Sequence, residues 1–370
     1  MALLEPRNDI LVNQVSKLAK FKAFLKRKNI EISFKRYGID ALGAMAQGLF
    51  CSLLIGTIIG TIGNLAGIEF LSQIGGYTKD VSGVAMAVAI GYALKADPMV
   101  LFSLATVGYA ANTLGGAGGP LAVLIIAIIA AEFGKAVSKE TKIDILVTPA
   151  VTILVGVGLA ALIAKPIGDA ANAFGGLIKS ATELQPFLMG VTVSVLVGIA
   201  LTLPISSAAI CAALSLTGLA GGAAVAGCCA QMVGFAVISF KENRWGGLVS
   251  QGLGTSMLQM PNIMKNPRIW IAPTLASAIT GPIATCVFHL EMNGVAVNSG
   301  MGTCGLCGPI GVITGWYTPA VEGVKAIAPT AMDWVGLALI CIVLPAVLAW
   351  LINLPLRKLG WVKEGDLKLG

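Results

Sequence analysis

Charged side chains are scarce in this chain of 370 residues, because Asp, Glu, Lys and Arg together make up only 12% of it. A soluble domain carries about 25% charged residues. Hydrophobic residues reach 56% and the mean hydropathy is +0.86. An ordinary soluble domain is therefore excluded. We predict an all-α polytopic membrane protein, since helices satisfy their own backbone hydrogen bonds in lipid.

Metal-binding side chains are also few. The chain has one histidine, His289, and eight cysteines, most of which lie in apolar runs where thiols behave as small hydrophobes. Cys304 and Cys307 form a CxxC pair, but two thiolates cannot complete a tetrahedral zinc site and no further ligand stands beside them. We expect no metal and no cofactor, and interpret the pair as small residues in a glycine-rich membrane hairpin.

The net charge of +7 comes mainly from the ends of the chain. Residues 17–36 alternate lysines and arginines with apolar side chains, which predicts an amphipathic helix lying on anionic lipids and not a face for nucleic acid. By the positive-inside rule this segment is cytoplasmic. It lacks the short apolar core and small-residue site of a cleavable signal.

Apolar runs bounded by charge, Gly or Pro predict about ten spans in two bundles, with both termini cytoplasmic. The segments are a basic segment (1–40), a scaffold and dimerisation bundle (41–165), an interfacial linker helix (166–185), a substrate-binding transport bundle (186–356) and a tail (357–370). The second bundle includes two short spans broken at Pro204. GxxxG spacings such as Gly56 to Gly60 favour close helix packing and a homodimer through the first bundle.

Two stretches, near residues 246–266 and 293–319, are too broken for ordinary spans and predict re-entrant hairpins, which must be covered by protein or water. In the first, polar residues recur every three to four positions and share one face if helical. They are Gln251, Thr255, Ser256, Gln259 and Asn262. A polar helix–helix seam is the alternative. Broken helices of this kind often bind solutes in transporters, so we favour a ligand site.

The sequence from Asn266, NPRIWIAPTLASAITGPIATCVF, resembles the enzyme IIC sugar-translocating subunits of the bacterial phosphotransferase system. It is most similar to the enzyme IIC-like branch labelled as toxin (perfringolysin) regulators. The resemblance implies a two-bundle fold in the bacterial cytoplasmic membrane and a separate enzyme IIB-like partner. Sugar-transporting relatives carry Ile-Thr-Glu-Pro before this element, where Leu253 to Ser256 stand here. Without that carboxylate, coupled phosphorylation is not expected, because a hydroxyl is no general base near neutral pH.

We therefore predict translocation of a small neutral sugar or polyol by movement of the second bundle, without intrinsic catalysis. The predicted substrate-binding residues are the five polar positions above together with Asn266, His289, Glu291 and Asn293. An ionisable pair at a cavity mouth is a functional candidate, but His289 and Glu291 also suit an interfacial polar cap. A solute-sensing regulatory protein is the main alternative. A channel or an amino-acid or ion transporter is the third.

Overall fold

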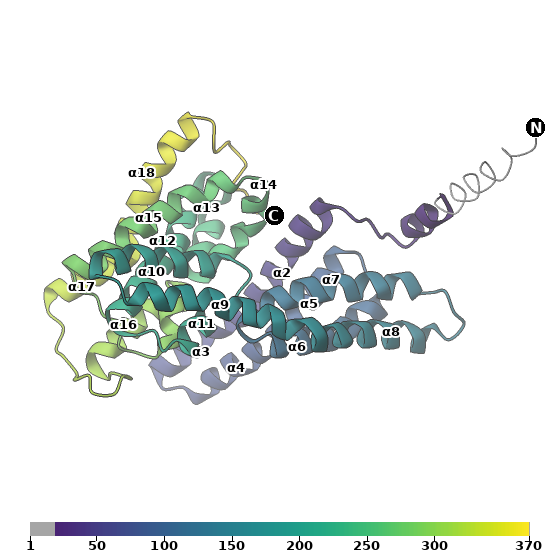
Figure 1. Cartoon of the computed structure of the whole chain (residues 1–370), viewed down its shortest axis with the longest axis horizontal. Helices are drawn as coiled ribbons and strands as arrows, with labels where there is room; N and C mark the ends of the chain where they lie inside the picture. Colours follow the sequence, from purple (N-terminus) through teal and green to yellow (C-terminus); the bar gives the residue numbers. More distant parts are fainter. Residues whose placement is uncertain (1–18, 370) are drawn as a thin grey trace, which may run out of the picture.

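The computed structural model describes residues 19–369, and every regular element in that range is helical (Figure 1). Six helices of the described part are long and apolar enough to cross a membrane, and shorter apolar helices accompany them. Large apolar side chains face outward, for example Leu154 and Leu162, each 73% exposed. The chain is thus an all-α polytopic membrane protein, as predicted.

The first bundle and the long helix that leaves it are built from residues 35–182, with short 3₁₀ and π segments labelled η. Their bounds are η1 Lys35–Asp40, α2 Ala41–Leu49, η2 Phe50–Leu54, α3 Ile55–Ala66, α4 Glu69–Asp80, α5 Ser82–Ala93, α6 Pro98–Gly115, η3 Gly116–Gly118, α7 Gly119–Val137, α8 Asp144–Leu159, η4 Ala160–Ala164 and α9 Lys165–Thr182.

The glycine spacing of α3 serves packing within the chain. A Cβ on Gly63 would lie 2.6 Å from the backbone nitrogen of Ser72, and one on Gly75 would lie 2.7 Å from the Cα of Gly60. Small residues here let the backbones of α3 and α4 touch, as they do at many membrane helix contacts. The α3 glycines that favoured a dimer in the sequence are thus covered by α4 in this structure.

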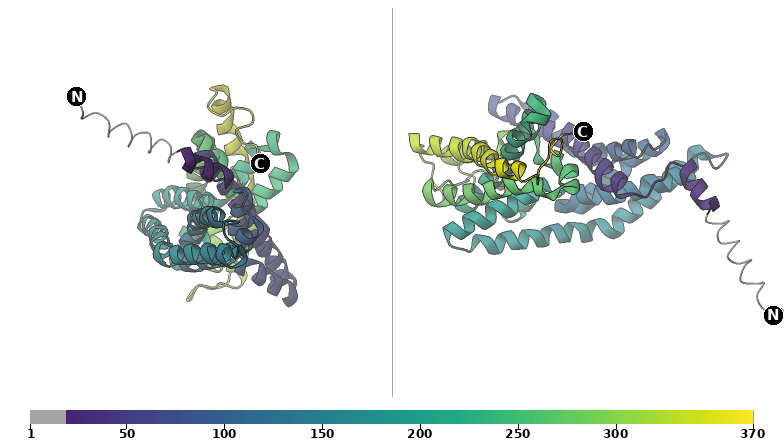
Figure 2. Two further views of the ribbon diagram at one scale, coloured as in Figure 1. Left: turned by 90° about the vertical axis from the view of Figure 1, so that its right-hand side faces the viewer. Right: turned by 90° about the horizontal axis from the view of Figure 1, so that it is seen from above.

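The predicted linker helix is not a separate element. Helices α8, η4 and α9 run on as one helix of 39 residues, Asp144–Thr182, because no residue between them leaves the helical region. At 1.5 Å per residue it is about 58 Å long, well beyond a bilayer core of about 30 Å. This helix bridges the two bundles (Figures 1 and 2).

The second bundle is built from residues 186–358. Its bounds are α10 Pro186–Thr202, α11 Ser207–Ala213, α12 Gly218–Ile238, α13 Phe240–Val249, η5 Ser250–Gly254, η6 Ser256–Gln259, α14 Met260–Lys265, η7 Pro267–Trp270, α15 Ile271–Pro282, η8 Ile283–Val287, η9 Ala296–Gly300, η10 Cys304–Leu306, α16 Cys307–Tyr317, α17 Ala331–Ala338, η11 Leu339–Val343 and α18 Leu344–Lys358.

Helix α12 is the centre of this bundle and packs against α10, α15 and α18. Its glycines allow that proximity, since a Cβ on Gly227 would clash with the Ser194 carbonyl oxygen of α10. Ser194 lies against Gly227 and Thr202 lies against Gln231, so α10 and α12 run parallel. The chain must return between them, which agrees with the predicted break at Pro204. The return segment holds only α11, whose seven residues are too few for a span.

In the basic N-terminal segment, the described helix ends earlier than the predicted amphipathic helix. Residues 17 and 18 lie outside the described residues, and the helix visible from residue 19 ends at residue 27. Arg36 does not lie on a lipid-facing surface. It is buried, and its guanidinium donates to the Leu94 carbonyl oxygen at 2.6 Å and to Asn29 Oδ1 at 3.0 Å. These acceptors satisfy the buried guanidinium, since polar groups inside a protein need hydrogen-bond partners.

Candidate functional site

A cavity of about 280 Å³ lies where the two bundles meet. The first bundle contributes α2, η2, α4, α5 and α6, and the second contributes the end of α10, the start of α11 and both broken stretches. The polar lining side chains are Lys79, Ser82, Asn112, Ser206, Ser207, Thr255 and Cys304.

The first broken stretch reaches this cavity at its break. The backbone of Thr255 is extended (φ −160°, ψ 144°) between η5 and η6, so the helix cannot continue there. We call residues 240–265 the first hairpin. Its break is held from behind by Ser256, whose hydroxyl lies 2.8 Å from that of Thr202 on α10. Ser256 therefore supports the site from within the second bundle and does not line the cavity.

The second broken stretch, residues 293–319, folds back on itself. Asn298 lies against Gly311 and Asn293 against Gly315, so its two arms are antiparallel. The turn requires glycine at Gly302, where φ is +51° and a Cβ would lie 2.7 Å from α12 backbone. Gly300, Met301 and Cys304 of this second hairpin line the same cavity.

Hydroxyl and amide groups dominate the polar part of the cavity. Thr255 Oγ1 accepts from the Met257 N–H at 3.1 Å, and Ser206 Oγ accepts from the Ala209 N–H at 3.2 Å, so both hydroxyls keep a proton to donate. Asn112 is half-buried and makes only a long contact, 3.5 Å, to Ser82. Among residues 19–369, Lys79 is the one charged residue that lines the cavity, and it is exposed; no carboxylate of these residues lines it.

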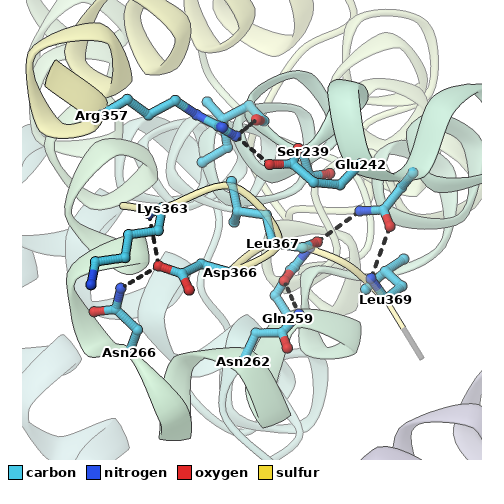
Figure 3. A network of polar contacts seen from close by, with 12 residues as sticks. Ser239, Glu242, Gln259, Asn262, Asn266, Arg357, Lys363, Asp366, Leu367 and Leu369 are labelled. Carbon is cyan, nitrogen blue, oxygen red and sulfur yellow. Dashed lines mark hydrogen bonds and ion pairs between the residues drawn. The ribbon is translucent and has the colours of Figure 1, made fainter. Parts of the chain in front are cut away.

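Four predicted binding residues, Gln251, Gln259, Asn262 and Asn266, do not line this cavity. Three of them instead contact residues 359–369, which we call the tail segment. Gln259 and Asn262 donate to backbone carbonyls of the tail segment. Asn266 donates to Asp366 (Figure 3). Gln251 lies behind them and accepts from Gln259 Nε2 at 2.8 Å. These residues do share one polar face, but in this structure the face contacts the tail segment.

His289, Glu291 and Asn293 lie together at a different position from both the cavity and the tail segment. They line a pocket of about 150 Å³ with residues of the loop before α17, and that pocket shares no lining residue with the inter-bundle cavity. His289 and Glu291 are exposed, and Asn293 Nδ2 donates to Glu291 at 2.8 Å. The structure thus separates this corner from the first hairpin, although both were expected in one site.

Several cavity residues were missed from the sequence. Asn112 could have been noticed, because an amide inside an apolar span is costly unless it has a partner. Ser82 and Ser206 carried no signal beyond their residue type. In the described range, no group of three or more His, Cys, Asp or Glu side chains is placed to hold a metal ion.

Comparison with known proteins gives one match. The family model described as "Phosphotransferase system, EIIC" matches residues 39–369. Neither the curated proteins nor the solved structures include a significant match to the chain. The match spans both bundles, the two hairpins and the tail segment. A helical membrane protein matched over nearly its whole length in this way belongs to the enzyme IIC family of the phosphotransferase system.

Proposed function

We propose that this enzyme IIC-type membrane transporter holds a neutral sugar or polyol in the inter-bundle cavity. The observation that carries the proposal is that both hairpins reach this one cavity, with the break at Thr255 and the turn beside Gly302. Broken helices present hydrogen-bonding groups to solutes that lipid would leave unsatisfied. Thr255, Ser206 and Asn112 supply the hydroxyl and amide groups that suit sugar hydroxyls.

A neutral solute fits the charge of the cavity. A buried cationic or anionic solute needs a partner of opposite charge, since desolvating an unpaired charge is costly. The described part of the chain contributes no carboxylate to the lining, and its lysine, Lys79, is exposed. We propose that the second bundle moves against the first during transport, because the cavity walls come from both.

Coupled phosphorylation is not part of the proposal. The groups at the first hairpin break are the hydroxyls of Thr255 and Ser256, neither of which is a general base near neutral pH. If a phosphoryl donor exists, a separate enzyme IIB-like partner must supply it. We further propose a homodimer through the first bundle, anionic lipids around the basic segment and cytoplasmic termini in a bacterial inner membrane. The cleft that Asp40 shares with Lys368 and Leu369 supports placing the start of the first bundle and the tail segment on one side of the membrane.

Proteoliposomes without any phosphoryl donor test the function. They should exchange at least one labelled solute from a panel of neutral sugars and polyols. Thr255→Val should lower its binding by about one to two decades, the effect of losing a buried hydrogen bond of about 1–3 kcal/mol. Thr192→Val, which changes a hydroxyl bonded to its own helix at Leu188, is the matched control and should leave exchange unchanged.

Other outcomes refute parts of the proposal. Solute binding without exchange would indicate a sensor. Phosphorylation of the solute that depends on a donor protein would show that the transport is coupled. Preference for a sugar acid over its neutral sugar, abolished by Lys79→Gln, would show that the solute is anionic.

A further inference from the structure

The tail segment follows α18, turns at Gly360 and crosses the first hairpin. The backbone has positive φ at Gly360 (69°) and Gly365 (91°), where turns need glycine. Two of its apolar side chains are inserted into the protein, Val362 at 2% exposure and Leu367 at 0%. They pack in the same core as Met260 and Ile263 of the first hairpin.

Side-chain amides of the first hairpin bind the backbone of the tail segment. The Leu367 carbonyl oxygen accepts from Asn243 Nδ2 at 2.8 Å and Gln259 Nε2 at 2.9 Å (Figure 3). The Lys368 carbonyl oxygen accepts from Asn262 Nδ2 at 2.9 Å, and the Leu369 N–H donates to Asn243 Oδ1 at 2.8 Å. The amides therefore bind the tail segment through its backbone, at a place where residues 364–367 form turns.

One charged residue adds to this recognition. The Asp366 carboxylate accepts from Asn266 Nδ2 and from the backbone N–H of Lys363 in the same tail segment, both at 2.8 Å. Asn266 Nδ2 also donates to the Trp361 carbonyl oxygen at 2.9 Å. The indole of Trp361 lies under the guanidinium of Arg268 at 5.4 Å. The Asn-Pro element thus holds the start of the tail segment, and the amides hold its end.

Side chains of the described residues, and not their backbone hydrogen bonds, join the tail segment to the first hairpin. The backbone–backbone hydrogen bonds of the tail segment found in the described part of the chain are within the segment or to the end of α18. What joins it to the first hairpin is side-chain amides, an aromatic contact and two apolar anchors. Removing the segment would take both bonded partners from the Asn243 amide and one acceptor each from Gln259 and Asn262, and it would leave an empty site for Leu367. Unmet amide groups beside an empty apolar site are features of a peptide-binding groove.

The groove is connected to the solute cavity. Gln259 links the tail segment to Gln251, which in turn donates to Ser239 at the end of α12 at 2.8 Å. Thr255 lies between these two glutamines in the chain and lines the cavity. Lys368 and Leu369 also line the cleft of about 790 Å³ that the first hairpin forms with α2 and α5. The tail segment therefore lies where the second bundle faces the first.

We propose that the tail segment is an exchangeable latch, an internal ligand of the amide groove whose release loosens the first hairpin at the solute cavity. While bound, it satisfies the amides and restrains the break at Thr255. When released, the hairpin gains freedom to move, and the groove becomes free to take up the same tail sequence with its leucine anchor added as a separate peptide. The inference concerns the groove and stands apart from the identity of the solute.

Hydrogen exchange in the full-length chain tests the latch. Leu367→Ser removes the buried anchor, and Leu359→Ser changes an exposed leucine of the same segment as the matched control. In Leu367→Ser, amides of residues 361–369 and 250–262 should exchange about tenfold faster or more, while α10 and α12 keep their protection. Leu359→Ser should match the wild type. A synthetic peptide of residues 361–369 added to Leu367→Ser should restore protection of 250–262, and the same peptide with serine at the anchor should not.

Each other result overturns the proposal. Faster exchange in 361–369 with no change in 250–262 would show that the segment does not restrain the hairpin. Loss of protection throughout α10 and α12 would make the segment a part of the fold. If residues 361–369 stay protected even when Asn243→Ala is added to Leu367→Ser, the segment is not exchangeable. Failure of the peptide to restore protection would refute the groove as a peptide site.

Discussion

Replacing Gln259 by alanine tests whether this residue holds the tail segment or binds the solute. Gln259 is fully buried and makes three hydrogen bonds. Without it, Leu367 keeps one donor from Asn243, and Asn262 keeps its bond to Lys368, but Gln251 Oε1 loses its donor. One orphaned buried acceptor costs about 1–3 kcal/mol, and the incompletely filled space adds on the order of 1 kcal/mol. We expect Gln259→Ala to lower the free energy of unfolding by about 2–4 kcal/mol.

Reversible denaturation in mixed micelles measures this change. Gln73→Ala is the matched control, because Gln73 lies exposed on α4 with a single bond to Glu69, and we expect it within about 0.5 kcal/mol of the wild type. Solute affinity of Gln259→Ala should fall by no more than a few fold, since its amide faces the tail segment. Unchanged stability combined with a tenfold loss of affinity would refute the reasoning and return Gln259 to the solute site.

Three further predictions concern the cavity, helix packing and acid. Asn112→Leu should weaken solute binding about tenfold in a filter-binding assay, because its amide is one of few polar groups in the cavity. Gly281→Ala should cost about 1–3 kcal/mol in the denaturation assay, since its Cβ would clash with the α10 backbone, whereas Gly176→Ala meets open space and should stabilise α9 by about 0.5–1 kcal/mol. A hydrogen bond from Lys139 holds the pKa of the Asp97 carboxyl below its ordinary 3.8, so this clamp between loops is present above that value. Exchange of residues 138–140 should rise only as pH falls from 3.8 through the lowered pKa, and Asp97→Asn should remove that dependence.

The membrane character and the two broken stretches were predictable because lipid cannot form hydrogen bonds with polar groups of the chain. Residues 246–266 and 293–319 carry too many polar groups and glycines to face hydrocarbon. The structure buries polar side chains of both stretches, for example Gln251, Ser256 and Ser299. The family was predictable from the element beginning at Asn266, which the comparison confirms. These inferences rest on local sequence alone.

The partners of the polar residues could not be predicted. The spacing of Gln251, Gln259 and Asn262 places their amides on one face, where each needs a hydrogen-bond partner. It does not show which group is that partner. A peptide backbone and a sugar both offer oxygen acceptors at similar distances. The tail segment lies more than a hundred residues away in the chain, and nothing in its composition marks it as an internal ligand. The cavity residues Asn112 and Ser206 come together only through the packing of two bundles.

A high-resolution structure of the protein purified with its native solute is the most direct test of the site. The account predicts solute density between the two bundles, within hydrogen-bonding distance of Thr255 and Asn112, with the tail segment or another peptide in the amide groove. Solute density bound by Gln259 and Asn262 in place of the tail segment, or by His289 and Glu291 at the far corner, would contradict it.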